Sequence, residues 1–363
     1  MRILYDGYVY QEQSAGGVNR YFANLIKRLP ANFIPLLTTC QDHFLDYPAH
    51  GNLQSFKFKR RRPLRVSCWV EKYYFRCVEA AVNYDVAHPT YYSLLTQREL
   101  AAYRRPVVLT VWDMIHERFT KQFRDGKLVV EMKRNAIEAA HSIICISENT
   151  KKDLLEHYPH VSEGRVRVTH LASELNESLA FGPELVPSRP YFLYVGARGG
   201  YKNFSILLAA FGKLASVRRD LALCVVGTPL SAAEQRDVAE MKLSGQFEHY
   251  GQVSDAQLAK LYRHSIALVY PSLYEGFGIP LVEAMACGTA VVASNRSSLP
   301  EVLGGAGLLF DPAADDLADV LLSLIDDPSE RERLVALGRE RAREFSWDQT
   351  VAQTLDVYRS AVD

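Results

Sequence analysis

Short apolar segments alternate with longer segments of helical period along most of this 363-residue chain. Residues 142–146 and 266–270 are almost entirely apolar, which is typical of strands buried on both faces of a parallel sheet. Between such strands, segments such as 128–140 and 204–215 carry apolar residues at the spacing of one helix face. This alternation predicts an α/β fold with doubly wound parallel sheets.

The alternation stops once, at residues 171–190, and then starts again. This segment contains three prolines and Gly182 and has little periodicity, so we interpret it as a linker between domains. A chain of this length is also expected to form two cores. We therefore predict two Rossmann-like domains that face each other across a cleft, residues 1–172 and 173–345. A C-terminal helix at about 346–363 is expected to pack back on the first domain.

Composition narrows the possible partners and compartments. The formal net charge is zero, so any electrostatic partner must be recognised by a local patch. Six cysteines include no CxxC pair, which argues against a disulfide framework or a zinc site and favours a reducing compartment. The N-terminal MRILYDG is charged too early for a signal peptide, and no apolar run approaches the roughly 18 residues of a membrane span. We expect a cytoplasmic protein.

One junction between a strand and a helix carries two glycines. After the strand at 266–270, Gly276 and Gly278 stand two residues apart in a turn, and a helix is expected to begin near Pro280. Backbone N–H groups at a glycine turn and at a helix N-terminus point toward one place. The junction is therefore a ready site for an anion.

Two carboxylates bracket this anion site, Glu275 at its mouth and Glu283 one turn into the helix. A carboxylate repels a phosphate, so these side chains are expected to bind another part of the ligand. Sugar hydroxyls need hydrogen-bond acceptors and are the natural candidates. The junction therefore predicts a nucleotide-sugar site.

A second glycine-rich loop follows the strand at 191–195. Its sequence, VGARGGYKNF, includes the cations Arg198 and Lys202 but does not match the GxxxxGK[ST] phosphate loop. Alone, it would be interpreted as surface charges on a turn. Because it follows another strand of the same sheet, it can face Glu275, and we interpret it as a phosphate-binding loop. Its glycines are Gly196, Gly199 and Gly200.

A glycine pair, Gly16 and Gly17, precedes the helix expected at 18–29. Such a pair is weak evidence by itself because tight turns use glycine constantly. Its position after the first strand of an α/β pattern is nevertheless one where such folds bind ligands.

The strand expected at 107–111 ends in WDMIHE, which places Asp113 and His116 at the carboxyl edge of the sheet. Asp113 would otherwise be a cap or turn residue, and His116 a loop histidine packed among aromatic side chains. We favour a site role for Asp113. For His116 both interpretations remain open.

A basic run, FKFKRRRPLR at 56–65, has no acidic residue near it between Asp46 and Glu71. Such a run is usually a solvated loop. Its aromatic edges, which include Trp69, also suit an anionic membrane surface or a phospholipid-linked substrate. No recognised RNA or DNA module accompanies the run, so nucleic acid is not expected. A solvated loop and a membrane contact through Lys57 to Arg65 remain equal alternatives.

The segment YEGFGIPLVEAMACGTAVVAS resembles the E-x7-E signature of the retaining glycosyltransferases of family four, which have the GT-B fold. GGVNRY resembles the N-terminal glycine loop of that family, and VWDMIHERF the loop that usually carries His-Asp or Tyr-Asp. VGARGGYKN resembles its Arg/Lys diphosphate loop, and SSLPEVLGGAGLLFDP the stretch after its E-x7-E helix. Each piece is modest alone, but the five occur in the right order over nearly the whole chain.

By position, the resemblance implies that Glu283 holds the ribose hydroxyls and that Glu275 accepts from hydroxyls of the donor sugar. The diphosphate is implied to lie against Arg198, Lys202 and the helix N-terminus, with Gly17 approaching it across the cleft. The base is implied to lie near the turn that contains Val253. The other implied contacts are Gly16, Gly196, His116, Gly276, Phe277, Gly278 and Ile279.

The resemblance also implies retention of configuration by front-face attack, in which the leaving phosphate takes the proton of the acceptor. No Asp pair lies in a loop suited to a DxD metal motif. Arg198, Lys202 and the helix dipole would therefore neutralise the leaving group, with no metal or other cofactor. Asp113 would orient the acceptor or stabilise oxocarbenium-like charge. Many members have a histidine directly before this aspartate, and Trp112 here argues against an imidazole-dependent step.

The expected reaction moves a sugar from a nucleoside diphosphate sugar to a saccharide or lipid-linked saccharide in surface polysaccharide synthesis. UDP-sugars such as UDP-glucose are favoured as donors, and the enzyme would be cytoplasmic or peripheral at the inner face of the membrane. One alternative is a nucleotide-sugar epimerase or hydrolase on the same fold, and another is a non-catalytic membrane-associated subunit. A dinucleotide-dependent oxidoreductase is disfavoured because no GxGxxG motif opens either domain.

Overall fold

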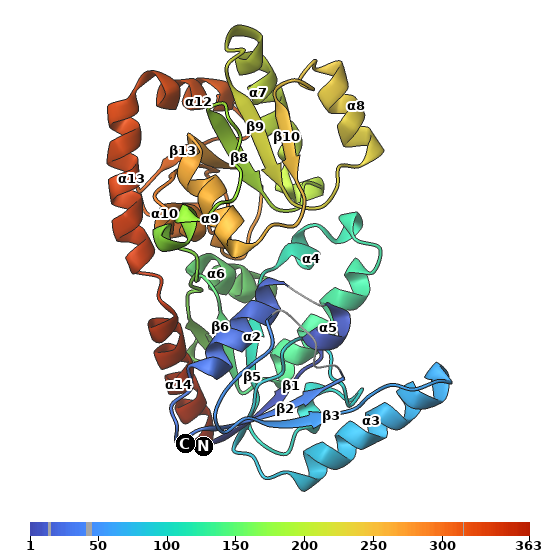
Figure 1. Cartoon of the computed structure of the whole chain (residues 1–363). Helices are drawn as coiled ribbons and strands as arrows, with labels where there is room; N and C mark the ends of the chain where they lie inside the picture. The colour runs from blue at the N-terminus through green and yellow to red at the C-terminus, as the bar shows by residue number, and fades with distance from the viewer. Residues whose placement is uncertain (14–15, 41–45, 315) are drawn as a thin grey trace. The chain divides into compact units, whose positions relative to one another are not determined.

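The computed structural model describes residues 1–13, 16–40, 46–314 and 316–363. It contains two compact units: unit 1 consists of Met1–Leu171 together with Trp347–Asp363, and unit 2 of Ala172–Ser346. Each unit has parallel strands with helices packed on them (Figure 1). The predicted α/β fold with two doubly wound sheets is therefore confirmed.

The described strands of unit 1 form two parallel groups, in the orders β3-β2-β1-β4 and β5-β6-β7. A parallel bridge between Ala87 and Val107 joins the two groups. The strand order reverses between β1 and β4, and sheets of this kind bind ligands outside the carboxyl ends of the strands at such a point. The strands are β1 (Arg2–Asp6), β2 (Ile34–Thr39), β3 (Gln54–Lys57), β4 (Val86–Ala87), β5 (Val108–Val111), β6 (Ser142–Cys145) and β7 (Val166–Val168).

Three helices of unit 1 begin at a glycine or a capping residue: α2 at Gly17, α5 at Gly126 and α6 after Ser147. Ser147 caps α6, and its hydroxyl accepts from the backbone N–H of Thr150 at 2.9 Å. Within the described residues of both units, no helix combines the length and apolarity needed to cross a membrane. The α-helices of unit 1 are α1 (Val9–Glu12), α2 (Gly17–Lys27), α3 (Leu64–Ala81), α4 (Ile115–Arg118), α5 (Gly126–Ala139), α6 (Glu148–His157) and α14 (Trp347–Val362). Short 3₁₀ helices are η1 (Leu100–Ala102), η2 (Thr120–Gln122) and η3 (Glu163–Arg165).

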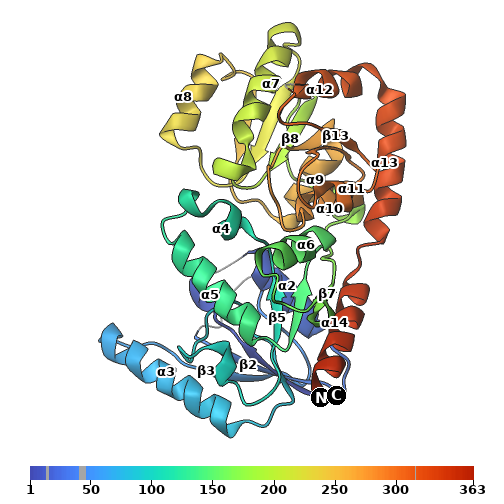
Figure 2. The same cartoon turned by 180° about the vertical axis from the view of Figure 1, so that it is seen from behind.

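Helix α14 follows unit 2 in the chain but belongs to unit 1, where it packs beside α2 (Figure 2). The hydroxyl of its Tyr358 lies 2.6 Å from His88 Nδ1 and 3.1 Å from the Tyr5 hydroxyl, and all three side chains are buried. Burial lowers the pKa of His88 to about 3, so this imidazole stays neutral. The network ties α14 to the first strand of the chain.

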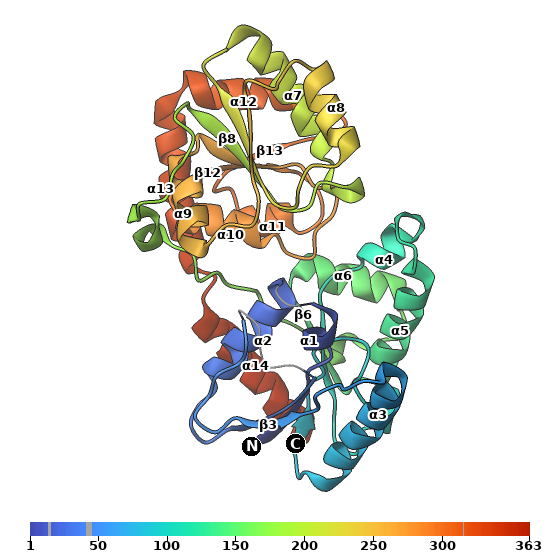
Figure 3. The same ribbon diagram turned by 45° about the vertical axis from the view of Figure 1, so that its right-hand side comes forward.

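Unit 2 has one parallel sheet in the order β10-β9-β8-β11-β12-β13, with its reversal between β8 and β11. Helices α7, α8 and α12 lie on one side of the sheet, and α9, α10 and α11 on the other (Figure 3). The strands are β8 (Tyr191–Val195), β9 (Ala222–Val226), β10 (Phe247–Tyr250), β11 (Ala267–Tyr270), β12 (Ala290–Ser294) and β13 (Leu308–Phe310). The α-helices are α7 (Phe204–Val217), α8 (Ala232–Glu240), α9 (Asp255–His264), α10 (Ile279–Ala286), α11 (Leu299–Leu303), α12 (Leu317–Asp326) and α13 (Pro328–Arg343).

The segment at 171–190, interpreted above as a linker, is a packed part of unit 2 from Ala172 onward. It contains the 3₁₀ helix η4 (Glu177–Phe181). Glu177 pairs with Arg263 at 3.2 Å and with Arg339 at 2.5 Å. These ion pairs hold the segment on unit 2, although its prolines and weak periodicity give no sign of them in the sequence.

Candidate active site

Two loops meet at the carboxyl edge of the unit 2 sheet, where the strand order reverses. Strand β8 leads into the 3₁₀ helix η5 (Gly200–Lys202), and β11 leads through residues 271–278 into α10. The backbone N–H of Leu273 donates to the carbonyl of Tyr201 at 2.7 Å, and the Asn203 amide donates to the Pro271 carbonyl at 3.3 Å. The two loops predicted to share a site are therefore joined directly.

An ion pair between Lys202 and Glu275 lies where these loops meet. The ammonium is 2.7 Å from Glu275 Oε1 and 3.0 Å from Oε2. It also lies 5.2 Å from the centre of the Tyr201 ring and 5.9 Å from that of Tyr270. The two side chains are 17% and 10% exposed, so the pair is sheltered but accessible to a ligand. Two residues predicted as catalytic are thus brought together.

The turn before α10 requires glycine at position 278. Gly278 is the N-cap with φ of +108°, and a Cβ there would come within 2.8 Å of the Leu299 side chain. The Ser298 hydroxyl lies 2.9 Å from the Glu275 carbonyl oxygen and 2.8 Å from that of Phe277, and it shares its single proton between these two acceptors. These bonds fix the backbone around Gly276, and α10 continues from Ile279 with the positive end of its dipole at the turn.

Glu283 lies one turn into α10, with 8% of the residue exposed. Its Oε2 accepts from the hydroxyl of Tyr262 on α9 at 2.9 Å. Burial, together with the nearby charge of Glu283, raises the pKa of Tyr262 well above its ordinary value, so the phenol remains a donor. Tyr262 was not predicted as part of the site, and as one apolar position of α9 it carried no distinctive signal.

Arg198 has contacts different from those of Lys202. Its side chain is 3% exposed, and Nε pairs with Glu234 Oε1 at 2.7 Å. Its Nη2 donates to the carbonyls of Thr228 and Pro229 at 2.8 and 3.0 Å, while the buried Nη1 has no partner among the described residues. Arg198 therefore braces the loops after β8 and β9, and its predicted contact with a diphosphate stays a prediction.

Two other predicted contacts of unit 2 lie at the same sheet edge. Gly196 directly follows β8 with φ of +128°, a conformation that glycine adopts readily, and a Cβ there would meet open space. Val253 follows β10 and is partly buried. Their positions are compatible with ligand contact, but among the described interactions neither residue contacts the Lys202–Glu275 pair.

In unit 1, Asp113 and His116 line a cavity of about 320 Å³. Aromatic rings of Tyr91, Tyr92 and Trp112 form part of its wall. Asp113 and His116, both predicted to lie near the end of β5, thus border the same cavity.

Lys133 is a member of this pocket that the sequence prediction missed. It comes from α5, is 1% exposed, and donates to the Asp113 carbonyl at 2.9 Å and to Glu117 Oε2 at 2.8 Å. Its ammonium lies 3.8 Å from Asp113 Oδ1. A signal was available, because Lys133 shares the buried side of α5 with Ala136 and Ile137.

Both interpretations considered for the polar residues of this loop are visible in the structure. Asp113 Oδ1 accepts from the N–H of Ile115 at 2.9 Å, which is a turn contact, and Asp113 also lines the cavity. The His116 ring packs on Phe123 with centroids 4.5 Å apart. Burial, followed by the charge of Lys133, lowers the pKa of His116 and favours the neutral imidazole. Trp112 packs edge-on against Tyr21 at 5.0 Å.

The glycine pair of unit 1 marks the start of α2, since Gly16 is its N-cap and Gly17 its first residue. A Cβ on Gly17 would meet nothing within 4 Å, so another group can approach the backbone closely there. A Cβ on Gly16 would approach the Gln13 side chain at 2.7 Å.

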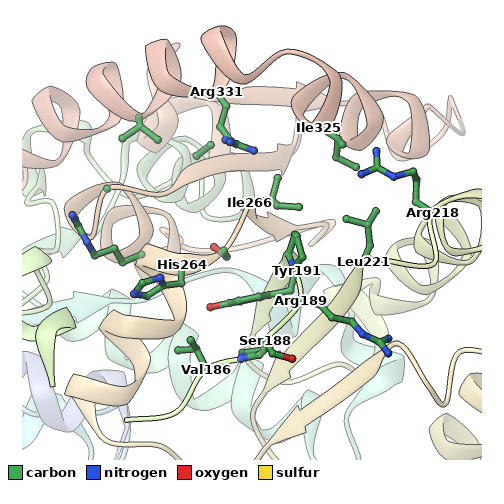
Figure 4. A pocket seen from close by; sticks show the side chains of 17 residues that line it. Val186, Ser188, Arg189, Tyr191, Arg218, Leu221, His264, Ile266, Ile325 and Arg331 are labelled. Carbon is green, nitrogen blue, oxygen red and sulfur yellow. The ribbon is translucent and has the colours of Figure 1, made fainter. Parts of the chain in front are cut away.

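A larger cavity, of about 650 Å³, lies at the opposite edge of the unit 2 sheet (Figure 4). Its lining includes Tyr191 and Ala290, the first residues of β8 and β12, and contains none of the predicted site residues. Two of its arginines already have acidic partners: Arg218 pairs with Asp220 at 2.9 Å, and Arg263 pairs with Glu177 in η4. Cavity size therefore does not identify the active site of this unit.

The described residues contain no cluster of three or more histidine, cysteine, aspartate or glutamate side chains that could hold a metal ion.

Comparison with known proteins gives a match in each half of the chain. Residues 15–175 match the family described as Glycosyltransferase Family 4, and residues 177–341 match Glycosyl transferases group 1. O-antigen chain mannosyltransferase B of Escherichia coli is 27% identical over 94% of this chain and 96% of its own. Alpha-maltose-1-phosphate synthase of Mycobacterium tuberculosis is 31% identical over 75% of this chain and 78% of its own.

Among solved structures, the HepE protein of Anabaena in complex with UDP-glucose is similar in fold, with a TM-score of 0.72 and 18% identity. The match covers 99% of this chain and 100% of that one. With the two doubly wound units described above, these matches show that the chain belongs to the group 1, family 4 glycosyltransferases and has their GT-B fold.

Proposed function

We propose that this glycosyltransferase is a retaining hexosyltransferase that uses a nucleoside diphosphate sugar. The observation that carries the proposal is the Lys202–Glu275 pair, which lies beside the N-terminus of α10 where the unit 2 sheet reverses its order. One place thus offers a cation and a helix dipole for phosphate, and a carboxylate for sugar hydroxyls.

The donor and acceptor classes draw on the relatives. We favour a UDP-sugar such as UDP-glucose as donor, with support from the UDP-glucose in the similar HepE structure. The acceptor would be a saccharide or lipid-linked saccharide of a surface polysaccharide, with support from the relative named for O-antigen chains.

On binding of the donor, Lys202 and Glu275 would give up their contact with each other and bind the donor instead. Lys202 would turn to the diphosphate, beside the backbone from Gly276 to Ile279, and Glu275 would accept from the hydroxyls of the sugar. Glu283 would accept from a ribose hydroxyl in addition to Tyr262, because a carboxylate has about four acceptor sites. Val253 would border the base.

Arg198 would contribute mainly by holding the loop that carries Lys202. Its bonds to Glu234 and to two carbonyls leave Nη1 as the group that could face a phosphate. Burial alone would raise the pKa of Glu234, but its bonds from Arg198 and Ser231 lower it. The brace therefore stays charged at neutral pH.

Transition-state stabilisation would come from groups that meet the charge of the leaving diphosphate. A charge-assisted hydrogen bond contributes about 1.5–3 kcal/mol and a helix terminus about 0.3–2 kcal/mol. Lys202 and α10 together would supply about 2–5 kcal/mol, or roughly one to four decades of rate. With front-face attack, the leaving phosphate would take the acceptor proton. Asp113 would orient the acceptor, with His116 as a neutral hydrogen-bonding partner.

The first test is the change in melting temperature on adding UDP-, GDP- or ADP-sugars. Micromolar binding of the right donor is expected to raise the melting temperature by a few degrees. Transfer to an added saccharide acceptor should then persist in EDTA, because Lys202 and α10 take the role of a metal. Stabilisation by none of the donors, or strict dependence on Mg²⁺ or Mn²⁺, would contradict the proposal.

The alternatives give different products in the same assay. A hydrolase would release free nucleotide and sugar without an acceptor, and an epimerase would change the sugar while it remains on the nucleotide. A non-catalytic subunit would do neither.

A further inference from the structure

Helix α3 buries polar residues and exposes apolar ones. On its inward side, Ser67, Glu71 and Glu79 are 4–9% exposed. On its outward side, large apolar side chains are 41–59% exposed: Leu64, Val66, Trp69, Val70 and Tyr73. From position 66 onward these recur every three or four residues, so they form one stripe along the helix. An ordinary surface helix has the opposite arrangement.

The inward side fixes this orientation of α3. Phe75 is fully buried in a cluster with Cys40 and Leu95, against which Phe58 packs. Glu71 accepts from Arg60 Nη2 at 3.0 Å. The interpretation of residues 56–65 as an unbalanced basic run is therefore wrong for Arg60, whose acidic partner lies about two turns inside α3.

We call the exposed apolar residues of this helix, from Leu64 to Tyr73, the α3 stripe. Basic side chains lie along one side of it. The ammonium of Lys72 and the guanidinium of Arg76 lie 5.4 and 5.3 Å from the centre of the Tyr73 ring. That ring in turn lies 4.7 Å from the ring of Trp69. Arg65 is exposed and shares its side of the helix with Lys72 and Arg76, since the three are seven and four positions apart.

We infer that the α3 stripe docks on an anionic phospholipid bilayer. A contiguous exposed apolar stripe indicates an interaction surface. Tyr and Trp suit the boundary between headgroups and acyl chains, and arginine and lysine can reach lipid phosphates while their stems stay in the apolar layer. The helix lies along the outside of unit 1 beyond β3, where a flat partner can reach it (Figures 1 and 2).

Charge complementarity favours a lipid surface over a second copy of the chain. In a symmetric dimer formed through two α3 stripes, the basic residues Arg65, Lys72 and Arg76 of one chain would lie near the same residues of the other chain. These like charges would repel each other. A bilayer with anionic headgroups instead attracts Arg65 and Lys72, while Arg76 adds its charge from a position where its Nε donates to the Thr96 carbonyl at 2.9 Å. The inference does not depend on the identity of the donor sugar.

The test is flotation of the full chain with vesicles of phosphatidylcholine, with or without phosphatidylglycerol. The chain is expected to float with the anionic vesicles and much less with the neutral ones. Replacing the two rings (W69S/Y73S) should weaken anionic-vesicle binding by about tenfold or more. Replacing two exposed arginines (R61S/R65S) should weaken it by roughly 25-fold, at about fivefold for each cation. Trp69 fluorescence should shift to the blue on binding.

Matched surface substitutions in unit 2 serve as controls. Val217 is 73% exposed and Lys213 and Arg236 are exposed, so V217S and K213S/R236S should float like the parent chain. All variants should keep the parent melting temperature, because they alter exposed side chains. A parent chain that stays unbound, or W69S/Y73S that floats equally well, would overturn the inference. A concentration-dependent dimer that W69S/Y73S abolishes, without vesicle binding, would overturn it in favour of self-association.

Discussion

Each unit holds a lysine paired with carboxylates near the carboxyl edge of its sheet, but access to the two lysines differs. Lys202 lies in η5 with 17% of its side chain exposed, and Lys133 lies in α5 with 1% exposed. Both ammonium groups lie within 3 Å of a glutamate oxygen, Glu275 or Glu117. An accessible pair can exchange its carboxylate for a ligand, whereas a sealed pair fixes the geometry around it. We therefore expect Lys202 to act in turnover and Lys133 in structure.

The largest expected effect is on stability, from Lys133→Met. This change leaves the 5% exposed Glu117 carboxylate without its cation, and breaking such a pair costs about 3–5 kcal/mol. Urea unfolding should show the loss. The double variant K133M/E117Q should recover a large part of it, because no uncompensated charge remains. If K133M lowers the free energy of unfolding by less than about 1 kcal/mol, Lys133 contributes no more than an exposed ion pair does, and the contrast between the two lysines fails.

A smaller free-energy change, now in the reaction barrier, is expected from Lys202→Met. Loss of one charge-assisted bond to the diphosphate should lower kcat by about ten- to a hundredfold, or roughly 1.5–3 kcal/mol. The free energy of unfolding should fall less than in K133M because the Lys202–Glu275 pair is more exposed. The exposed residue Lys213 provides the control, since Lys213→Met should leave both quantities unchanged. Normal turnover in K202M would remove Lys202 from the mechanism.

The smallest effect, when taken per pH unit, concerns a buried carboxyl at the end of β1 that has neutral donors instead of a lysine. Asp6 accepts from the N–H of Leu95 at 3.1 Å and from the Tyr103 hydroxyl at 3.4 Å. Burial raises its pKa to about 7 despite these bonds. The unfolded carboxyl ionises near pH 4, so this group's stabilisation is complete below that pH and is lost as the pH rises to about 7.

Asp6→Asn should remove that slope, which amounts to at most about 1.4 kcal/mol per pH unit. His88 has the opposite effect on the pH dependence of stability. Burial lowers its pKa to about 3, so below about pH 6.5 protonation favours the unfolded chain and the free energy of unfolding falls. Urea unfolding between about pH 4 and 7 should therefore show stability rising with pH more steeply in D6N than in the parent chain. Parallel curves would show that Asp6 is ionised throughout.

The unit 2 site was the most predictable part because its signals are local. Strand β11, the glycine turn and α10 are consecutive in the chain, and the φ of +108° at Gly278 explains why glycine stands there. The pairing of Lys202 with Glu275 followed from the rule that neighbouring parallel strands end at one edge. The roles of these residues toward a donor remain predictions.

Contacts between residues far apart in the sequence were not predictable from local pattern. Arg198 has Glu234 as its partner, 36 positions away, so a cation that looked free in its loop is a brace. Lys133 was overlooked because a single lysine in a helix is usually solvated. Helix α3 was missed because most of its large apolar residues face outward, so its periodicity does not mark the core.

The position of α14 sets the order in which the two units can be completed during synthesis. The buried hydroxyl of Tyr358 bonds to Tyr5 and His88, so unit 1 lacks part of its core until residues 347–362 have left the ribosome. Unit 2, residues 172–346, is a continuous stretch and is fully synthesised before that. Nascent chains usually fold from the N-terminal domain onward. Here the N-terminal unit can be completed only after the whole of its successor has been synthesised.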